Sequence, residues 1–481
     1  MTLEKKAARS GVWFAGLSTF SQALSWLFTM YIARLLRPED YGLMTMAAFL
    51  TSYMEVFSEL GLGSAIIQRK EVSRNELSSI FWLSIFVGAG LCCSCFVLAF
   101  PTAWIFENRQ VIPVTFMISA LFIIGSAMTV PYNMLRRDFG FRKLGMINVV
   151  SVIISNSAMV LFAINGYGVY TLIWGTIILR ISNTFLVFTT AGWRPEFRFV
   201  FNEVKPFLKF GVNLAGSSTL IRVFESLDKL IVGRVFNARN LGYYGFASTL
   251  ASLPIDKIGP IFQQILFPLL SRFQEDWDDY CKIYFRSLKY YTLIVVPLFI
   301  CGVVFGKEII VTILGYKWEP IIPFFKAFCI AKLFDSLSEF CNLLHVSRGH
   351  TKVVFRFAIV KTLVMFISIL IAALHSFASL TIPWALVYSC LCIGWILYSL
   401  KANNVGILTY LKMISSSFYA AFIIAGGILV FRLIVEITYR EIVNRTVLFG
   451  EIVVIGGILY VCYILLFERK LIRSLRNLMG E

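Results

Sequence analysis

The stretch GVWFAGLSTF at residues 11–20 recurs two hundred positions later as GVNLAGSSTL at residues 211–220. Gly, Val, Ala, Gly, Ser and Thr match in order, and the same offset pairs Gly42 with Gly242. The two copies therefore stay in register through a whole apolar span and the turn after it. Two similar halves that each cross a membrane several times are the usual architecture of a transporter.

The composition around this repeat is that of an integral membrane protein. Of the 481 residues, 58% are hydrophobic and 15% are charged, which is more apolar surface than a water-soluble core could hide. Runs of about 20 apolar residues, the length that crosses a bilayer as a helix, recur from end to end. We predict an all-α, polytopic fold with about fourteen spans, near residues 11–36, 41–67, 77–104, 111–135, 145–164, 167–190, 207–235, 241–270, 287–306, 320–345, 353–374, 378–399, 414–436 and 447–467.

Basic residues alternate between the predicted loops. The formal net charge is +17, and loops such as the one holding Arg136, Arg142 and Lys143 are rich in basic residues, whereas the loop with Arg34 and Arg37 is poor in them. The positive-inside rule then places both termini in the cytoplasm. Because the charge follows the loops in this way, it indicates membrane orientation and not nucleic-acid binding.

The repeat also predicts the domain organisation. Six spans separate the copies, so both enter the membrane in the same orientation and are related by a pseudo-two-fold axis along the membrane normal. We predict a six-helix lobe at 1–200, a second at 201–400, and two additional helices with a basic cytoplasmic tail at 401–481. The linker GWRPEFRFVFNEVKPFLKF at 192–210 alternates basic and aromatic residues. It fits either an amphipathic element on the cytoplasmic surface or a solvated loop.

Several charged residues fall inside the predicted spans, where each would cost about 2.5 to 3.5 kcal/mol facing lipid at mid-depth. Most must therefore face protein or a water-filled cavity. Arg offers phosphate a planar fork of donors and Lys a mobile point charge, so mid-depth basic groups suit an anionic substrate such as a diphosphate. The candidate substrate-binding residues are Arg180, Arg222, Lys257, Lys332 and Lys361.

Acidic residues at similar depth have two interpretations. Glu55, Glu59 and Asp256 are candidate proton or sodium sites for ion coupling. The alternative is internal ion pairing that only fixes helix packing, and it applies above all to Asp335 and Glu339, which share a helix face with Lys332. Loops are too short for a catalytic domain and no metal-ligand spacing occurs, so we expect no enzyme activity, no catalytic residues, no metal and no cofactor.

Four segments resemble a known family: LLRPEDYG at 35–42, ELGLGSAIIQR at 59–69, LDKLIVGRVFNARNLGYYGFA at 227–247 and FPLLSRF at 267–273. They are similar to the Wzx-type polysaccharide transporters, or O-antigen flippases, of the multidrug/oligosaccharidyl-lipid/polysaccharide flippase superfamily, in the branch of colanic-acid and lipopolysaccharide exporters. The resemblance covers about residues 1–400. It implies a bacterial inner-membrane flippase that moves an undecaprenyl-diphosphate-linked oligosaccharide to the periplasmic leaflet by alternating access.

The same resemblance implies the partners: the lipid-linked oligosaccharide, membrane lipid, and the polysaccharide polymerase with its chain-length machinery, without nucleic acid. Three other functions remain open at this point. They are a cation-coupled multidrug exporter of the same fold, a peptidoglycan-precursor flippase, and a membrane glycosyltransferase or polymerase. The first would favour an acidic, aromatic cavity, and the last would need acidic catalytic residues in a sizeable extramembrane loop.

Overall fold

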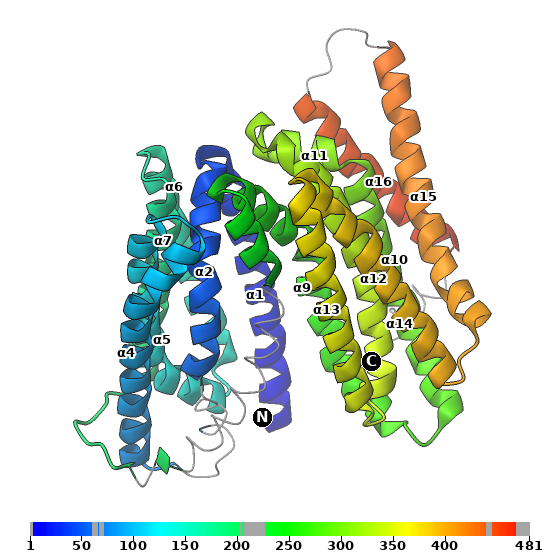
Figure 1. Cartoon of the computed structure of the whole chain (residues 1–481). Coiled ribbons are helices and arrows are strands. Elements are labelled where there is room, and N and C mark those ends of the chain that lie inside the picture. The colour runs from blue at the N-terminus through cyan, green and yellow to red at the C-terminus, as the bar shows by residue number, and fades with distance from the viewer. Residues whose placement is uncertain are drawn as a thin grey trace. The chain divides into compact units, whose positions relative to one another are not determined.

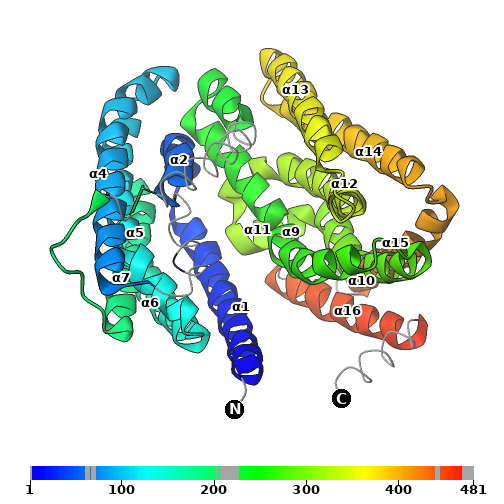
Figure 2. The ribbon, with the colours of Figure 1, turned by 90° about the horizontal axis from the view of Figure 1, so that it is seen from below.

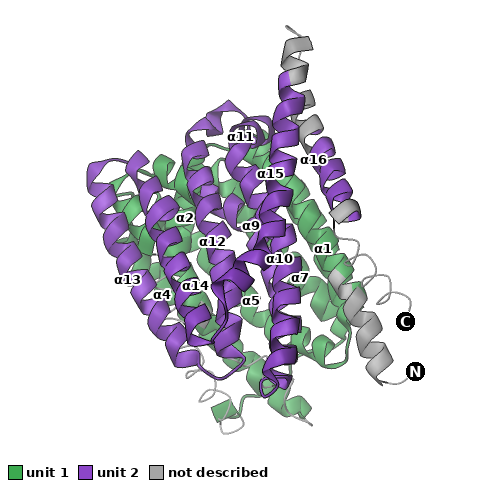
Figure 3. Cartoon of the chain, turned by 90° about the vertical axis from the view of Figure 1, so that its right-hand side faces the viewer, with its two compact units in different colours: residues 1–245 green, residues 246–481 purple. Residues whose placement is uncertain are grey.

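A computed structural model describes residues 3–59, 66, 72–201, 204–205, 227–438 and 445–467, and that part of the chain contains helices and no strand. Eight of its helices are long and apolar enough to cross a membrane. The prediction of an all-α, polytopic membrane protein is therefore confirmed. The count of fourteen spans stays a prediction. The chain packs as two compact units, residues 1–245 and 246–481 (Figure 3).

Besides a helical stretch at 227–235, the described part of the first unit contains six long helices and the beginning of another (Figure 1). They are α1 (Leu3–Leu35), α2 (Pro38–Glu59), α4 (Arg74–Ile105), α5 (Val111–Arg137), α6 (Phe141–Ile164), α7 (Val169–Ala191) and the start of α9 (Ala238–Arg272). The strongest packing joins α4 to α5, α1 to α6 and α6 to α7, while α2 lies against α4, α5 and α7 (Figure 2).

Local sequence signals set the ends of these helices. Ser73 caps α4: its hydroxyl accepts a hydrogen bond from the Glu76 backbone N–H, and the Glu76 carboxylate accepts one from the Ser73 N–H. Pro38 begins α2, where its missing N–H costs nothing. Gly192 ends α7 in the left-handed conformation, with φ of 62°.

The second unit is organised around one central helix, α12. Its elements are the rest of α9, α10 (Trp277–Val304), α11 (Gly306–Leu314), the 3₁₀ turn η1 (Tyr316–Ile321), α12 (Ile322–Val346), α13 (Thr351–His375), the 3₁₀ turn η2 (Ala378–Leu380), the π-helical turn η3 (Pro383–Tyr388), α14 (Ser389–Ala402), α15 (Ile407–Thr438) and α16 (Arg445–Phe467). Helix α12 packs against α10, α13, η3 and α14 (Figure 2).

The two helices predicted to lie outside the repeat are part of the core of this unit. Helix α15 packs along α10, and α16 packs against α15. Phe305, Ile424 and Ile428 form a buried cluster there, and Nη1 of Arg432 on α15 donates to Oε1 of Glu308 at 2.6 Å. The lobe boundaries predicted at residues 200 and 400 remain a prediction.

The predicted spans correspond closely to helices wherever the structure describes them. The second repeat copy at 211–220 and most of the span at 207–235 lie outside the described residues. One helix was missed: α11, nine residues between two loops, is too short to register as a span.

The starts of α2 and α9 are repeat-related, and they pack against each other inside the first unit. A Cβ on Gly42 would overlap the backbone carbonyl of Ala238, and a Cβ on Gly242 would overlap the carbonyl of Pro38. Only glycine leaves room for two helix backbones at this distance. The two glycines that the sequence matches two hundred positions apart are therefore needed for one contact.

Two further pairs show the same pseudo-symmetry. Nε of Arg239 lies 3.3 Å from Oε1 of Glu39, and the Cα of Gly245 faces the side chain of Thr45. Each pair again joins residues two hundred positions apart. Contact between repeat counterparts is the arrangement expected close to a two-fold axis, and the pseudo-two-fold relation of the lobes stays a prediction.

We expect Gly42→Ala to lower stability by about 1 to 3 kcal/mol, because the added methyl group meets the rigid backbone of Ala238. Gly90→Ala in α4 is the matched control: nothing lies within 4 Å of its added Cβ, and alanine is the better helix former. Thermal unfolding of both variants in detergent tests this. Equal melting temperatures for the two variants would show that the α2–α9 contact does not require glycine.

Candidate functional site

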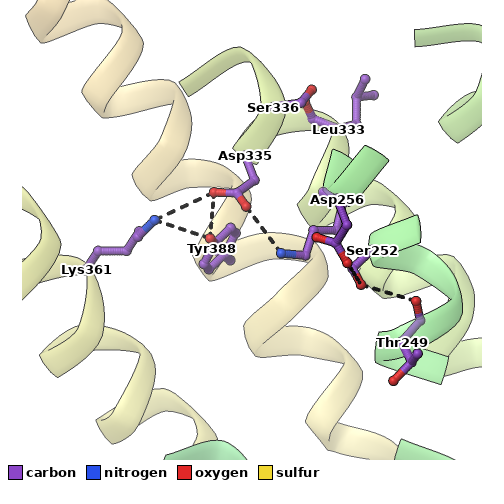
Figure 4. A network of polar contacts seen from close by, with 9 residues as sticks. Thr249, Ser252, Asp256, Leu333, Asp335, Ser336, Lys361 and Tyr388 are labelled. Carbon is purple, nitrogen blue, oxygen red and sulfur yellow. Dashed lines mark hydrogen bonds and ion pairs between the residues drawn. The ribbon is translucent and has the colours of Figure 1, made fainter. Parts of the chain in front are cut away.

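The most concentrated polar network of the second unit surrounds the carboxylate of Asp335 at the middle of α12. Oδ1 accepts a hydrogen bond from the Tyr388 hydroxyl at 2.7 Å and lies 3.6 Å from Nζ of Lys361. Oδ2 accepts one from Nζ of Lys332 at 3.3 Å. Figure 4 shows the Asp335, Lys361 and Tyr388 side chains converging. One buried carboxylate thus holds two lysines from two helices.

Each member reaches the network for a local structural reason. Lys332 and Asp335 are three residues apart on α12 and so lie on one face. Lys361 projects from the middle of α13. Tyr388 ends the π-helical turn η3, which begins at Pro383. Turns of π-helix are rare overall, but they occur frequently at functional sites. This one places the phenol of Tyr388 against Asp335.

A second carboxylate balances the charge of this network. Glu339 lies one turn beyond Asp335 on α12 and forms a side-chain hydrogen bond with Asn342. Asn342 in turn accepts from the indole N–H of Trp395 at 2.9 Å. With Lys332 and Lys361, the cluster holds two positive and two negative groups. This geometry fits the ion-pairing interpretation for Asp335 and Glu339, since unpaired charges are very costly in an interior.

In the first unit the structure joins two residues that were predicted for different roles. Nη2 of Arg180, at the middle of α7, lies 3.7 Å from Oε1 of Glu55 on α2. The two side chains are 41% and 51% exposed. A charge this exposed at the middle of a membrane helix, as Arg180 is, requires a polar surrounding and not lipid chains.

Asp256 and Lys257 are exposed neighbours on α9. The Ser252 hydroxyl, one turn earlier, is 2.9 Å from Oδ2 of Asp256 and 3.1 Å from the carbonyl of Thr249, so it can donate to either (Figure 4). Pro254 interrupts the backbone hydrogen bonding of the same helix.

Two candidates cannot be placed. Arg222 lies outside the described residues, and so does the side chain of Glu59, the last residue of α2. Within the described ranges, no group of three or more His, Cys, Asp or Glu residues could hold a metal ion. The substrate and ion-coupling roles of all eight candidates stay predictions.

Tyr388 was missed by the sequence analysis. Its ring also lies under the Lys361 ammonium, 5.2 Å from centroid to Nζ, an arrangement that stabilises a cation. The available signal was Pro383 inside an otherwise helical apolar run, which marks a local departure from α-helix.

Comparison with known proteins gives the family. The family model described as "Polysaccharide biosynthesis protein" matches residues 31–323, more than half of the chain. The chain belongs to this family. The match confirms the resemblance to the polysaccharide flippase family that the four sequence segments predicted.

Relatives in this family cover most of the chain. The lipopolysaccharide biosynthesis protein WzxC of Escherichia coli is 25% identical over 378 residues, 77% of this chain and 76% of WzxC. The succinoglycan biosynthesis transport protein ExoT of Rhizobium meliloti is 20% identical over 98% of this chain and 96% of ExoT. Among solved structures, the lipid II flippase MurJ in an inward closed conformation aligns over 96% of this chain and all of MurJ, with TM-score 0.72 and 16% identity. That likeness shows a shared fold.

We expect Asp335→Ala to lower stability by about 3 kcal/mol, the low end for a buried pair, because it leaves two partly buried ammonium groups, 24% and 20% exposed, without this carboxylate. The charge-free variant Lys332→Met, Asp335→Leu, Glu339→Gln, Lys361→Met should stay near wild type, because it removes all four charges of the network together. Thermal unfolding in detergent measures both.

The exposed pair of Asp279 and Lys282 on α10 is the matched control, with the same spacing and an Oδ1–Nζ distance of 2.8 Å. Asp279→Ala should change the melting temperature little, since exposed ion pairs contribute little to stability. A large loss in the control, or none in Asp335→Ala, would contradict the assignment of the Asp335 network as a buried electrostatic core.

Proposed function

We propose that this protein is a flippase that moves an undecaprenyl-diphosphate-linked oligosaccharide, an O-antigen unit or exopolysaccharide repeat, from the cytoplasmic to the periplasmic leaflet of the bacterial inner membrane. Membership of the polysaccharide biosynthesis family supports the substrate class. The names of the relatives point the same way, since ExoT is a succinoglycan transport protein. The protein acts as a transporter and not as an enzyme.

The Arg180–Glu55 pair is the observation that carries the mechanism. Its two charged groups are about half exposed, Arg180 at the middle of α7 and Glu55 in the last turns of α2, so a polar path is needed to reach them. At 3.7 Å the pair is longer than a direct charge-assisted hydrogen bond of about 2.7 to 2.9 Å. A phosphate group offers Arg180 a better partner, because the guanidinium fork matches two phosphate oxygens.

Glu55 is then the resident counter-ion of Arg180. When the diphosphate arrives, it takes over the guanidinium and repels the carboxylate, so substrate binding exchanges one ion pair for another. Lys257, exposed on α9, and the unplaced Arg222 are further candidates for the same anion. The membrane potential favours the outward movement by about 2.3 kcal/mol per negative charge per 100 mV.

The contact between the starts of α2 and α9 is the periplasmic closure in this mechanism. It lies at the helix ends whose loops carry few basic residues, which the positive-inside rule assigns to the periplasm. Release of the glycan requires Gly42 and Gly242 to separate, together with Glu39 and Arg239. Both termini are cytoplasmic, the repeat gives lobes at 1–200 and 201–400, and the polymerase with its chain-length machinery receives the product.

The test is translocation of a lipid-diphosphate-linked oligosaccharide in proteoliposomes that contain only this protein. Access of an added glycan-modifying enzyme reports the movement. The wild type should make the glycan accessible. If none of a range of glycans becomes accessible to the enzyme and the protein exports organic cations instead, the protein is a multidrug exporter and the proposal is wrong.

In the same assay we expect Arg180→Gln to lower the translocation rate by at least tenfold, because it removes the guanidinium fork. Glu55→Gln should lower both the apparent KM and the maximal rate, since Arg180 then holds the diphosphate without a competitor. Lys412→Gln, a charge change at an exposed position of α15, is the control and should leave both unchanged. A raised KM for Glu55→Gln would show that Glu55 is not a competing counter-ion.

A further inference from the structure

The segment that follows α7 is a fixed element of the first unit. Residues 193–201, here called the strap, leave the helix at Gly192 and run along α4 (Figure 1). The Glu196 N–H donates to the Ser78 hydroxyl at 3.1 Å, and the Val200 N–H donates to that of Ser79 at 3.2 Å. Both serines are buried. The strap is thus held to α4 by its own backbone.

Trp193 anchors the beginning of the strap in the core of the first unit. Its indole is 4% exposed and packs against Phe81 and Phe188. In addition, the indole N–H of Trp82 on α4 donates a hydrogen bond to the Glu196 carbonyl at 2.8 Å. These contacts fix the backbone of the strap and therefore the direction in which its other side chains point.

What the strap presents outward is aromatic. Phe197 is 96% exposed and lies with its ring 5.3 Å from that of Trp82. Phe199 packs edge-on against the exposed Phe86 at 5.6 Å, and Phe201 is also exposed. A phenylalanine held fully exposed loses about 1.5 to 3 kcal/mol of burial energy in water. The same side chain is favoured where it meets lipid.

Basic residues alternate with these rings. Arg194 and Arg198 on the strap are exposed, as is Arg74 at the first position of α4. Among the described residues of the strap and the first turn of α4, the acidic groups are the exposed Glu196 and the half-buried Glu76, whose carboxylate caps α4. The balance of the exposed groups is positive.

The depth of the strap matches a membrane interface. Its contacts on α4 extend from Ser78 to Phe86, eight residues or about 12 Å of helix. They begin within two turns of the start of α4, where a spanning helix leaves the hydrocarbon. The headgroup layer is about 5 to 8 Å thick on each side, so contacts over about 12 Å cover this layer and reach the outermost part of the hydrocarbon. Aromatic rings and arginines at this level bind lipid headgroups.

We propose that the strap, with Arg194 and Arg198 as phosphate-binding groups and Phe197 and Phe199 as interfacial anchors, is a binding site for anionic phospholipid. The rings enter the boundary between headgroups and acyl chains, and the guanidinium groups bind the headgroup phosphates. A zwitterionic headgroup carries a compensating positive charge and binds more weakly. The site does not depend on the transported substrate.

The test uses the purified full-length protein in nanodiscs of phosphatidylcholine with increasing phosphatidylglycerol, read out as the melting temperature. Phosphatidylglycerol should raise the melting temperature of the wild type. Arg194→Gln with Arg198→Gln should weaken the apparent affinity for phosphatidylglycerol roughly thirtyfold, since each basic group at a membrane surface contributes about one kcal/mol. The matched control is Arg37→Gln with Arg109→Gln, two exposed arginines at the opposite end of the same unit.

Two further variants separate lipid binding from folding. Arg194→Lys with Arg198→Lys keeps the charge and should restore most of the phosphatidylglycerol response. Phe197→Ser with Phe199→Ser should lower the melting temperature in both lipids while keeping the preference for phosphatidylglycerol. An equal phosphatidylglycerol response in the Arg194/Arg198 and Arg37/Arg109 glutamine variants would overturn the proposal. So would a wild type that is equally stable in both lipids, because the strap would then face a protein partner.

Discussion

A charge inside hydrocarbon needs a partner or water, and this constraint organises the polar features of both units. In the second unit it draws two lysines, two carboxylates and the Tyr388 phenol into one buried network around α12. In the first it leaves Arg180 and Glu55 half exposed and only loosely paired. The two solutions differ in consequence. A closed network stabilises packing, whereas a loose, wet pair can exchange partners with a ligand.

Much of the fold was predictable because a membrane helix is a strong local signal. The spans predicted at 77–104 and 353–374 correspond to helices at 74–105 and 351–375, and the shared face of Lys332 and Asp335 follows from their spacing. The partners of those residues did not follow. Periodicity places a side chain on a helix face but does not say which helix packs there, so neither Lys361 beside Asp335 nor Glu55 beside Arg180 was predicted as a pair.

The strap gives a second example of a structure that the sequence pattern alone does not determine. Its alternating basic and aromatic residues fit both an amphipathic element and a solvated loop. The hydrogen bonds that the buried Ser78 and Ser79 hydroxyls accept from the backbone of the strap hold it along α4, and those serines give no signal in an apolar sequence. Small buried hydroxyls thus determine how a whole linker is presented.

The contact at Gly42 and Gly242 bears on how the protein evolved. Beside it Glu39 meets Arg239 and Thr45 meets Gly245, and contact between equivalent residues is the pattern of an isologous interface between identical subunits. Before the duplication, a half-length chain would have made the same contact as a parallel homodimer, with one glycine serving both subunits. Fusion freed the copies to diverge, and the acid–base pair at position 39 is a difference that only a fused chain can carry.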